Sequence, residues 1–316
     1  MLPSLLHTFI LLAIANGCLG TTFTLINRCE YTVWPGILSN AGAGGFGTTG
    51  FQLPQGAARS FQAGPGWSGR FWGRTGCVFD PATGQGSCAT GDCGSNQIEC
   101  NGAGAKPPAT LAEFTIGSDT QDFYDVSLVD GYNLPMIVEA AGGSGACGST
   151  GCLTDLNRIC PSELRVGNGQ ACRSACEAFR RPEFCCSGAY GSPDTCRPSA
   201  YSAAFKKACP RAYSYAYDDA TSTFTCNGAD YTITFCPSLP SQKSSSSSSS
   251  SMPAPAAGGS AAQPQGDDDV DDGRQPESGW LPNFIIGGSS SSSALQSNPI
   301  IVSTIILLIL ILFLVD

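Results

Sequence analysis

The chain has 316 residues, a net charge of −9 and a single histidine, His7. It has no basic tract, which argues against nucleic acid as a partner. Because the only histidine lies in the leading segment, histidine-based nucleophilic catalysis and histidine-ligated metal sites are excluded from the rest of the chain. We therefore expect no metal and no cofactor.

The first twenty residues have the pattern of a secretory signal peptide. Residues 5–14 form a short apolar core, and small residues follow, with Cys18 and Gly20 at the −3 and −1 positions before Thr21. A buried N-terminal helix is the weaker interpretation. We expect cleavage after Gly20 and export of the remaining chain.

The cysteine count supports an extracellular protein. Of the 17 cysteines, Cys18 lies in the predicted signal peptide and the others lie between Cys29 and Cys236. Their even number allows every thiol of the processed chain to pair, which requires an oxidising compartment. Paired cysteines cannot act as thiolate nucleophiles, so any catalysis depends on carboxylates, as in glycoside hydrolysis.

Residues 21–237 predict a mainly β domain. Short runs of β-branched and aromatic residues predict strands at 23–26, 31–34, 111–116, 123–129 and 231–235. Many such strands with glycine-rich turns favour a sandwich or a barrel. The cysteine-rich segment 154–209 has few strand runs. It predicts a helix over 171–180 and a second marked by Tyr201, Phe205 and Ala208.

The composition changes after residue 237. Residues 238–288 contain a serine run and an acidic block and have too little apolar surface to fold, so we expect a disordered linker. Residues 289–316 combine small residues, a polar spacer and the apolar segment 300–315, which resembles a signal for attachment of a GPI anchor near Ser289. A membrane span is the alternative, although a helix of this length covers only ~24 Å of a ~30 Å hydrocarbon core.

Several motifs identify a family. Residues 84–94 read GQGSCATGDCG, residues 70–77 read RFWGRTGC, residues 107–114 read PPATLAEF and residues 125–135 read DVSLVDGYNLP. With the order of the cysteines, these motifs resemble thaumatin-like, pathogenesis-related plant proteins over essentially all of residues 21–237.

The resemblance implies a flattened β-sandwich (about 21–74, 109–153 and 210–237), a small loop lobe (about 75–108) and a disulfide-rich loop and helix lobe (about 154–209). It also implies eight disulfides. These are Cys29–Cys236, Cys77–Cys88, Cys93–Cys100, Cys147–Cys226, Cys152–Cys209, Cys160–Cys172, Cys176–Cys185 and Cys186–Cys196.

The same resemblance implies an acidic cleft between the sandwich and the disulfide-rich lobe. The family's cleft positions correspond in this sequence to Arg70, Glu113, Asp125, Asp130 and Asp218, with the adjacent Asp219 as an alternative to Asp218. Strand alternation independently places Glu113 on the face opposite Phe114. Asp125 and Asp130 are an odd number of residues apart, so they would project from opposite faces of one regular strand. A turn or a bulge must therefore redirect Asp130 if both side chains line one cleft.

We expect a monomeric plant defence protein that binds β-1,3-glucan. We expect this protein to be held at the outer face of the plasma membrane by its GPI anchor or to lie in the cell wall. One alternative is an endo-β-1,3-glucanase with Glu113 as proton donor and Asp125 or Asp130 as base or nucleophile. Another is a non-catalytic signalling or structural module. Four aromatic residues could stack on sugar rings, although their commoner role is in a core: Trp34, Trp67, Phe71 and Trp72.

Overall fold

The computed structural model describes residues 20–118 and 120–237 of the protein. The predicted signal peptide before Gly20, the linker and the GPI signal lie outside the described residues. In the part that is described, no helix combines the length and the apolar character needed to cross a membrane.

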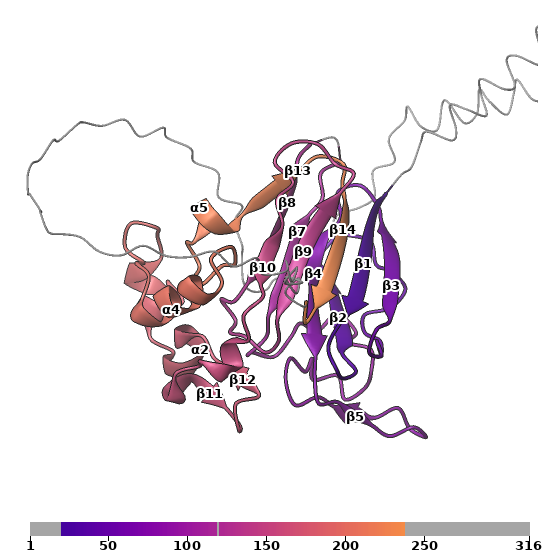
Figure 1. The fold of residues 1–316 in the computed structure, drawn as a ribbon, viewed down its shortest axis with the longest axis horizontal. Helices are drawn as coiled ribbons and strands as arrows, with labels where there is room; N and C mark the ends of the chain where they lie inside the picture. Colours follow the sequence, from indigo (N-terminus) through magenta and orange to yellow (C-terminus); the bar gives the residue numbers. More distant parts are fainter. Residues whose placement is uncertain (1–19, 119, 238–316) are drawn as a thin grey trace, which may run out of the picture. The chain divides into compact units, whose positions relative to one another are not determined.

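Two five-stranded sheets form the centre of the fold (Figure 1). In the first sheet, β1 and β14 pair in parallel, and all other pairs are antiparallel. Its order is β10 (Thr150–Cys152), β9 (Met136–Ala141), β14 (Asp230–Phe235), β1 (Thr21–Asn27), β3 (Ala58–Ala63). The second sheet is antiparallel throughout. Its order is β13 (Phe224–Cys226), β8 (Asp122–Ser127), β7 (Leu111–Thr115), β4 (Ser68–Arg74), β2 (Trp34–Ser39).

The core lies between the two sheets because alternate residues of each strand face inward. Phe23 of β1 is fully buried, and its ring centre lies 5.1 Å from that of Phe71 in β4 and 4.8 Å from that of Phe114 in β7. Tyr124 of β8 and Tyr231 of β14 extend this aromatic contact, with ring centres 4.9 Å apart. The mainly β sandwich expected from the sequence is confirmed.

The predicted strands are correct with one exception. The runs at 23–26, 111–116, 123–129 and 231–235 correspond to β1, β7, β8 and β14. The run at 31–34 is wrong as a strand, because β2 begins only at Trp34 and Val33 makes an isolated bridge to Leu53. The side-chain amide of Asn27 donates to the carbonyls of Tyr31 and Leu53 and thereby holds residues 28–32 as a loop. Strands β3, β4, β9, β10 and β13 were not predicted from the sequence.

The segment 154–209 consists of short helices, 3-10 turns and one two-stranded hairpin. These are η1 (Leu156–Arg158), η2 (Ser162–Leu164), β11 (Arg165–Val166), β12 (Ala171–Cys172), α2 (Ala175–Phe179), α3 (Pro182–Cys185), η3 (Gly188–Tyr190) and α4 (Ala200–Ala208); α5 (Asp219–Ser222) follows them. The helix marked by Tyr201, Phe205 and Ala208 is confirmed as α4.

The helix expected over 171–180 is only partly correct. Ala171 and Cys172 form β12 instead, because the backbone of Cys172 exchanges two hydrogen bonds of 2.8 Å with Tyr132. Helix α2 begins after Ser174, whose hydroxyl accepts the backbone N–H of Glu177. Such capping satisfies one of the free donors at a helix start.

Eight disulfides cross-link the described residues, and their partners are those that the family resemblance implies. Cys29–Cys236 joins the loop after β1 to the end of β14. The adjacent Cys185 and Cys186 bind different partners, so α3 is fixed to α2 and to the loop before α4.

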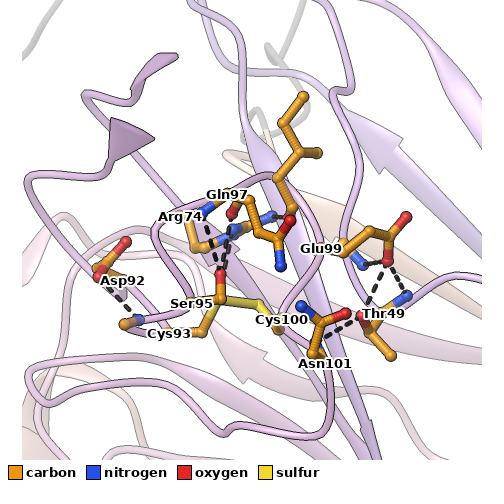
Figure 2. Close-up of a disulfide and its surroundings, with 12 residues drawn as sticks. Thr49, Arg74, Asp92, Cys93, Ser95, Gln97, Glu99, Cys100 and Asn101 are labelled. Atoms are coloured by element: carbon orange, nitrogen blue, oxygen red, sulfur yellow. Dashed lines mark hydrogen bonds between the residues drawn. A yellow bond between two sulfur atoms is a disulfide. The ribbon is translucent and has the colours of Figure 1, made fainter. Parts of the chain in front are cut away.

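A buried arginine organises the small loop region at the end of β4 (Figure 2). The side chain of Arg74 is fully buried and donates to the backbone carbonyls of Trp34 at 2.9 Å, Pro35 at 3.3 Å and Ile98 at 2.7 Å. Burial lowers its pKa to about 10, although the charges of Asp92 and Glu99 oppose this shift. The region also contains the short hairpin of β5 (Val78–Phe79) and β6 (Gly86–Ser87).

Candidate functional site

Three charged side chains form a row across the middle of the second sheet. In the observed register Arg70 of β4 lies opposite Glu113 of β7, and Glu113 lies opposite Asp125 of β8. Directly opposed residues have Cβ atoms about 5 Å apart and project from the same face of a sheet. Phe114 and Tyr124, their neighbours along the strands, are buried on the other face. The row therefore lies on the outer face of the sandwich, opposite its core.

The three side chains are half-buried but not fully paired. Arg70 Nη1 lies 3.4 Å from Glu113 Oε1, and both side chains are 26% exposed. The Nε atom of Arg70 and the Oδ1 atom of Asp125 are buried and have no hydrogen-bond partner. Because buried polar atoms are usually hydrogen-bonded, these two atoms show that the polar groups of the row are incompletely satisfied within the protein.

A tight turn redirects the chain at Asp130, as the parity argument required. Strand β8 ends at Ser127, and the backbone N–H of Gly131 donates to the carbonyl of Leu128 at 3.0 Å. Gly131 has a positive φ of 87°, and a Cβ at this position would lie 2.7 Å from the carbonyl oxygen of Cys172. The turn thus needs a glycine on both grounds.

The carboxyl groups of this region have raised pKa values. Burial raises the pKa of Glu113; Arg70 opposes the shift and Asp130 adds to it. Burial and then the charge of Glu113 raise the pKa of Asp125 well above its usual value, with Arg70 opposing and Asp219 adding to the increase. Burial also raises the pKa of Asp130, against the effect of Arg70. One arginine cannot neutralise several carboxylates, so this cluster takes up protons more readily than isolated carboxyl groups do.

The fifth expected residue, Asp218, has a different environment from the other four. Its Oδ2 atom accepts the backbone N–H and the hydroxyl of Ser214, each at 2.9 Å, and lies 3.0 Å from Lys206 Nζ. The neighbouring Asp219 accepts the hydroxyl of Tyr213 and is the aspartate of this pair whose charge acts on Asp125. We therefore propose Asp219, rather than Asp218, as the fourth acidic residue of the site.

The aromatic residues considered as sugar platforms mostly belong to the interior. Trp67, Phe71 and Trp72 are at most 2% exposed. Trp34 is half-buried and packs on Phe79, with ring centres 4.8 Å apart. The sequence analysis missed Phe123, which is 48% exposed. It lies two residues before Asp125 in β8, and the i, i+2 spacing was the signal for a shared face.

The chemistry of the row is that of polar recognition. Arg70 supplies guanidinium donors, and the carboxyl groups supply acceptors when ionised and O–H donors when protonated. Among residues 20–118 and 120–237, no three histidine, cysteine or acidic side chains converge in a way that could hold a metal ion. The groups present suit a neutral ligand with many hydroxyls.

Comparison with known proteins gives a consistent family assignment. Residues 27–237 match the thaumatin family. "Thaumatin-like protein 1" from Arabidopsis thaliana is 71% identical over 231 residues, which cover 71% of this chain and 89% of the relative. "Pathogenesis-related thaumatin-like protein 3.5" from Cryptomeria japonica is 58% identical over 238 residues, covering 74% of this chain and 98% of the relative.

Among solved structures, a thaumatin-like xylanase inhibitor is 26% identical, with a TM-score of 0.39 over 68% of this chain and 99% of the inhibitor. From the family match and the identity to these relatives, the chain belongs to the thaumatin family.

Proposed function

We propose that this protein is a plant defence protein of the cell surface that binds β-1,3-glucan through Arg70, Glu113, Asp125 and Asp130. The observation that carries the proposal is the cross-strand row of one arginine and two carboxyl groups with two buried, unpartnered polar atoms. A neutral polyol can hydrogen-bond the exposed parts of the Arg70 and Glu113 side chains without bringing a further charge into the site.

The defence role and the location are supported by the family and by the disulfides. The Cryptomeria japonica relative is named as pathogenesis-related. Eight disulfides persist only in an oxidising environment, which favours an extracellular site of action. Fungal walls present β-1,3-glucan to proteins in that location.

Binding can be tested with the protein purified from a secreting host. Isothermal titration with a soluble β-1,3-glucan is expected to show binding, with Glu113→Gln and Asp125→Asn each weakening it. Glu139→Gln in β9 is a matched control, because this exposed carboxylate lies on the other sheet. Absence of glucan binding by the wild-type protein would refute the proposal and leave a signalling or structural module.

Hydrolysis is the second candidate, because the raised pKa of Glu113 suits a proton donor. Glycoside hydrolysis needs two carboxyl groups that flank the scissile bond. Glu113 and Asp125 instead project side by side from one face, so they approach a sugar from the same side. We therefore favour binding over cleavage. Release of reducing sugar that is abolished by Glu113→Gln would reverse this preference.

Attachment to the membrane is a separate proposal that depends on the sequence after residue 288. Small residues around Ser289 followed by a spacer and an apolar segment support a GPI anchor. Phosphatidylinositol-specific phospholipase C is expected to release the protein from membranes of the producing cells. Retention after this treatment, with release only by detergent, would favour a membrane span.

A further inference from the structure

An exposed phenylalanine lies beside the charged row. Phe123 is 48% exposed, whereas its neighbours Asp122 and Tyr124 are 2% and 1% exposed. Alternation along β8 places Phe123 on the same outer face as Asp125. A half-exposed aromatic ring contributes little to the core, so packing alone does not explain this residue at this position.

Phe123 lies in a second cross-strand row that runs next to the charged one. It is opposite Thr115 of β7 on one side and opposite Thr225 of β13 on the other. Thr115 is exposed and Thr225 is half-buried. The ring is therefore flanked by two hydroxyl-bearing side chains and separated from the carboxyl row by two strand residues, a distance of ~7 Å.

This arrangement has the chemistry of a sugar subsite. The face of a pyranose ring is apolar C–H surface, which packs on an aromatic ring, and its edge carries hydroxyls, which suit threonine partners. Single exposed apolar residues are common on protein surfaces and need no explanation by themselves. Here the aromatic ring shares its face with Thr115 and Thr225 and with the charged row, in which two polar atoms are unpartnered.

We propose that Phe123, with Thr115 and Thr225, forms an aromatic subsite next to the carboxyl row and binds a sugar unit of the same glucan chain. The proposal rests on the proposed glucan binding. It adds a consequence that the charged row alone lacks: affinity rises from a single glucose unit to an oligosaccharide, because only an oligosaccharide spans the ~7 Å between the two rows.

The test compares Phe123→Ala with wild type in titrations with glucose and with a β-1,3-linked hexasaccharide. Loss of ring stacking is expected to weaken hexasaccharide binding about tenfold. Glucose binding at the carboxyl row is expected to change less than twofold. Tyr31→Ala is the matched control, because Tyr31 is an aromatic residue of similar exposure, 47%, in the loop after β1.

A second variant gives an independent readout. Phe123→Trp keeps an aromatic platform, so it is expected to bind the hexasaccharide at least as tightly as wild type. Its added indole starts half-exposed, and saturation with hexasaccharide is expected to shift its emission to shorter wavelength relative to the wild-type background. Unchanged hexasaccharide affinity in Phe123→Ala, or no emission shift at saturation in Phe123→Trp, would overturn the subsite while leaving glucan binding at the carboxyl row intact. Failure of the wild-type protein to bind either sugar would instead refute the proposed function, and the subsite with it.

Discussion

Removal of the Cys29–Cys236 disulfide is expected to destabilise the protein more than removal of a short-range disulfide. This bond joins residues 207 positions apart and ties the end of β1 to the end of β14, its parallel partner. In the unfolded chain it closes the longest loop of the eight. The relevant change is Cys29→Ala with Cys236→Ala, which leaves no free thiol.

The magnitude follows from the length of the closed loop. A loop of about 200 residues corresponds to about 5 kcal/mol of unfolded-state entropy at 25 °C. The Cys147–Cys226 disulfide lies inside this loop and remains intact in the variant. It bridges 79 residues and therefore shortens the effective loop by about that number. Because the dependence is logarithmic, the value stays near 5 kcal/mol for an effective loop of about 130 residues.

The comparison is Cys77→Ala with Cys88→Ala. This disulfide spans only 11 residues, so its removal corresponds to about 3 kcal/mol. The two double variants are thus expected to differ by about 2 kcal/mol in the free energy of unfolding, measured by guanidinium titration with a common slope. Equal losses, or a larger loss for the short loop, would show that unfolded-state entropy is not the dominant contribution and would refute the reasoning.

Three further predictions concern single side chains. Burial raises the pKa of Asp125 in the folded protein, so the contribution of this carboxyl group to stability is complete below the ordinary pKa of aspartate and is lost as pH rises through the raised pKa. Asp125→Asn should therefore raise the melting temperature at pH 7 but not at pH 3. A variant that melts at a lower temperature than wild type at pH 7 would contradict this. Arg74→Met leaves three buried carbonyls without their donor and should cost at least about 3 kcal/mol in guanidinium unfolding, whereas Arg28→Met, at an exposed arginine, should cost less than about 0.5 kcal/mol. Asp219→Asn should lower the pKa of Asp125, measured by NMR titration, while Asp218→Asn should mainly reduce stability. A lower pKa of Asp125 in Asp218→Asn, and not in Asp219→Asn, would instead assign Asp218 to the site.

The sequence predicted the elements whose residues carry a local signal. Strand β14 was recognised because Tyr231 and Ile233 alternate with polar residues, and both are buried. Strand β4 was missed because Gly69 and Gly73 interrupt its apolar pattern. The structure explains these glycines: a Cβ on Gly69 would lie 2.3 Å from the carbonyl of Leu38, and one on Gly73 would lie 2.8 Å from the side chain of Leu134. Tertiary packing, not local propensity, requires them.

The site was only partly predictable for a similar reason. The family motifs indicated Arg70, Glu113 and Asp125, and strand alternation indicated the outward direction of Glu113. No local pattern could distinguish Asp218 from Asp219, because the difference depends on Lys206, which is far from them in sequence. Phe123 was not singled out from the sequence, because its exposure depends on which parts of the sheet face the lobes cover.

The register of the second sheet couples the fold to the site. Arg70 and Glu113 project outward only because the alternate residues Phe71 and Phe114 are inside the aromatic core. A slip of one residue in any pair of strands would bury a charge and expose a phenylalanine, at a cost of several kcal/mol. The core thus fixes the relative positions of the charged side chains, and these positions do not depend on flexible loops. In the proposed binding of a flexible polysaccharide, side chains whose positions are set by the core would reduce the entropy lost on association.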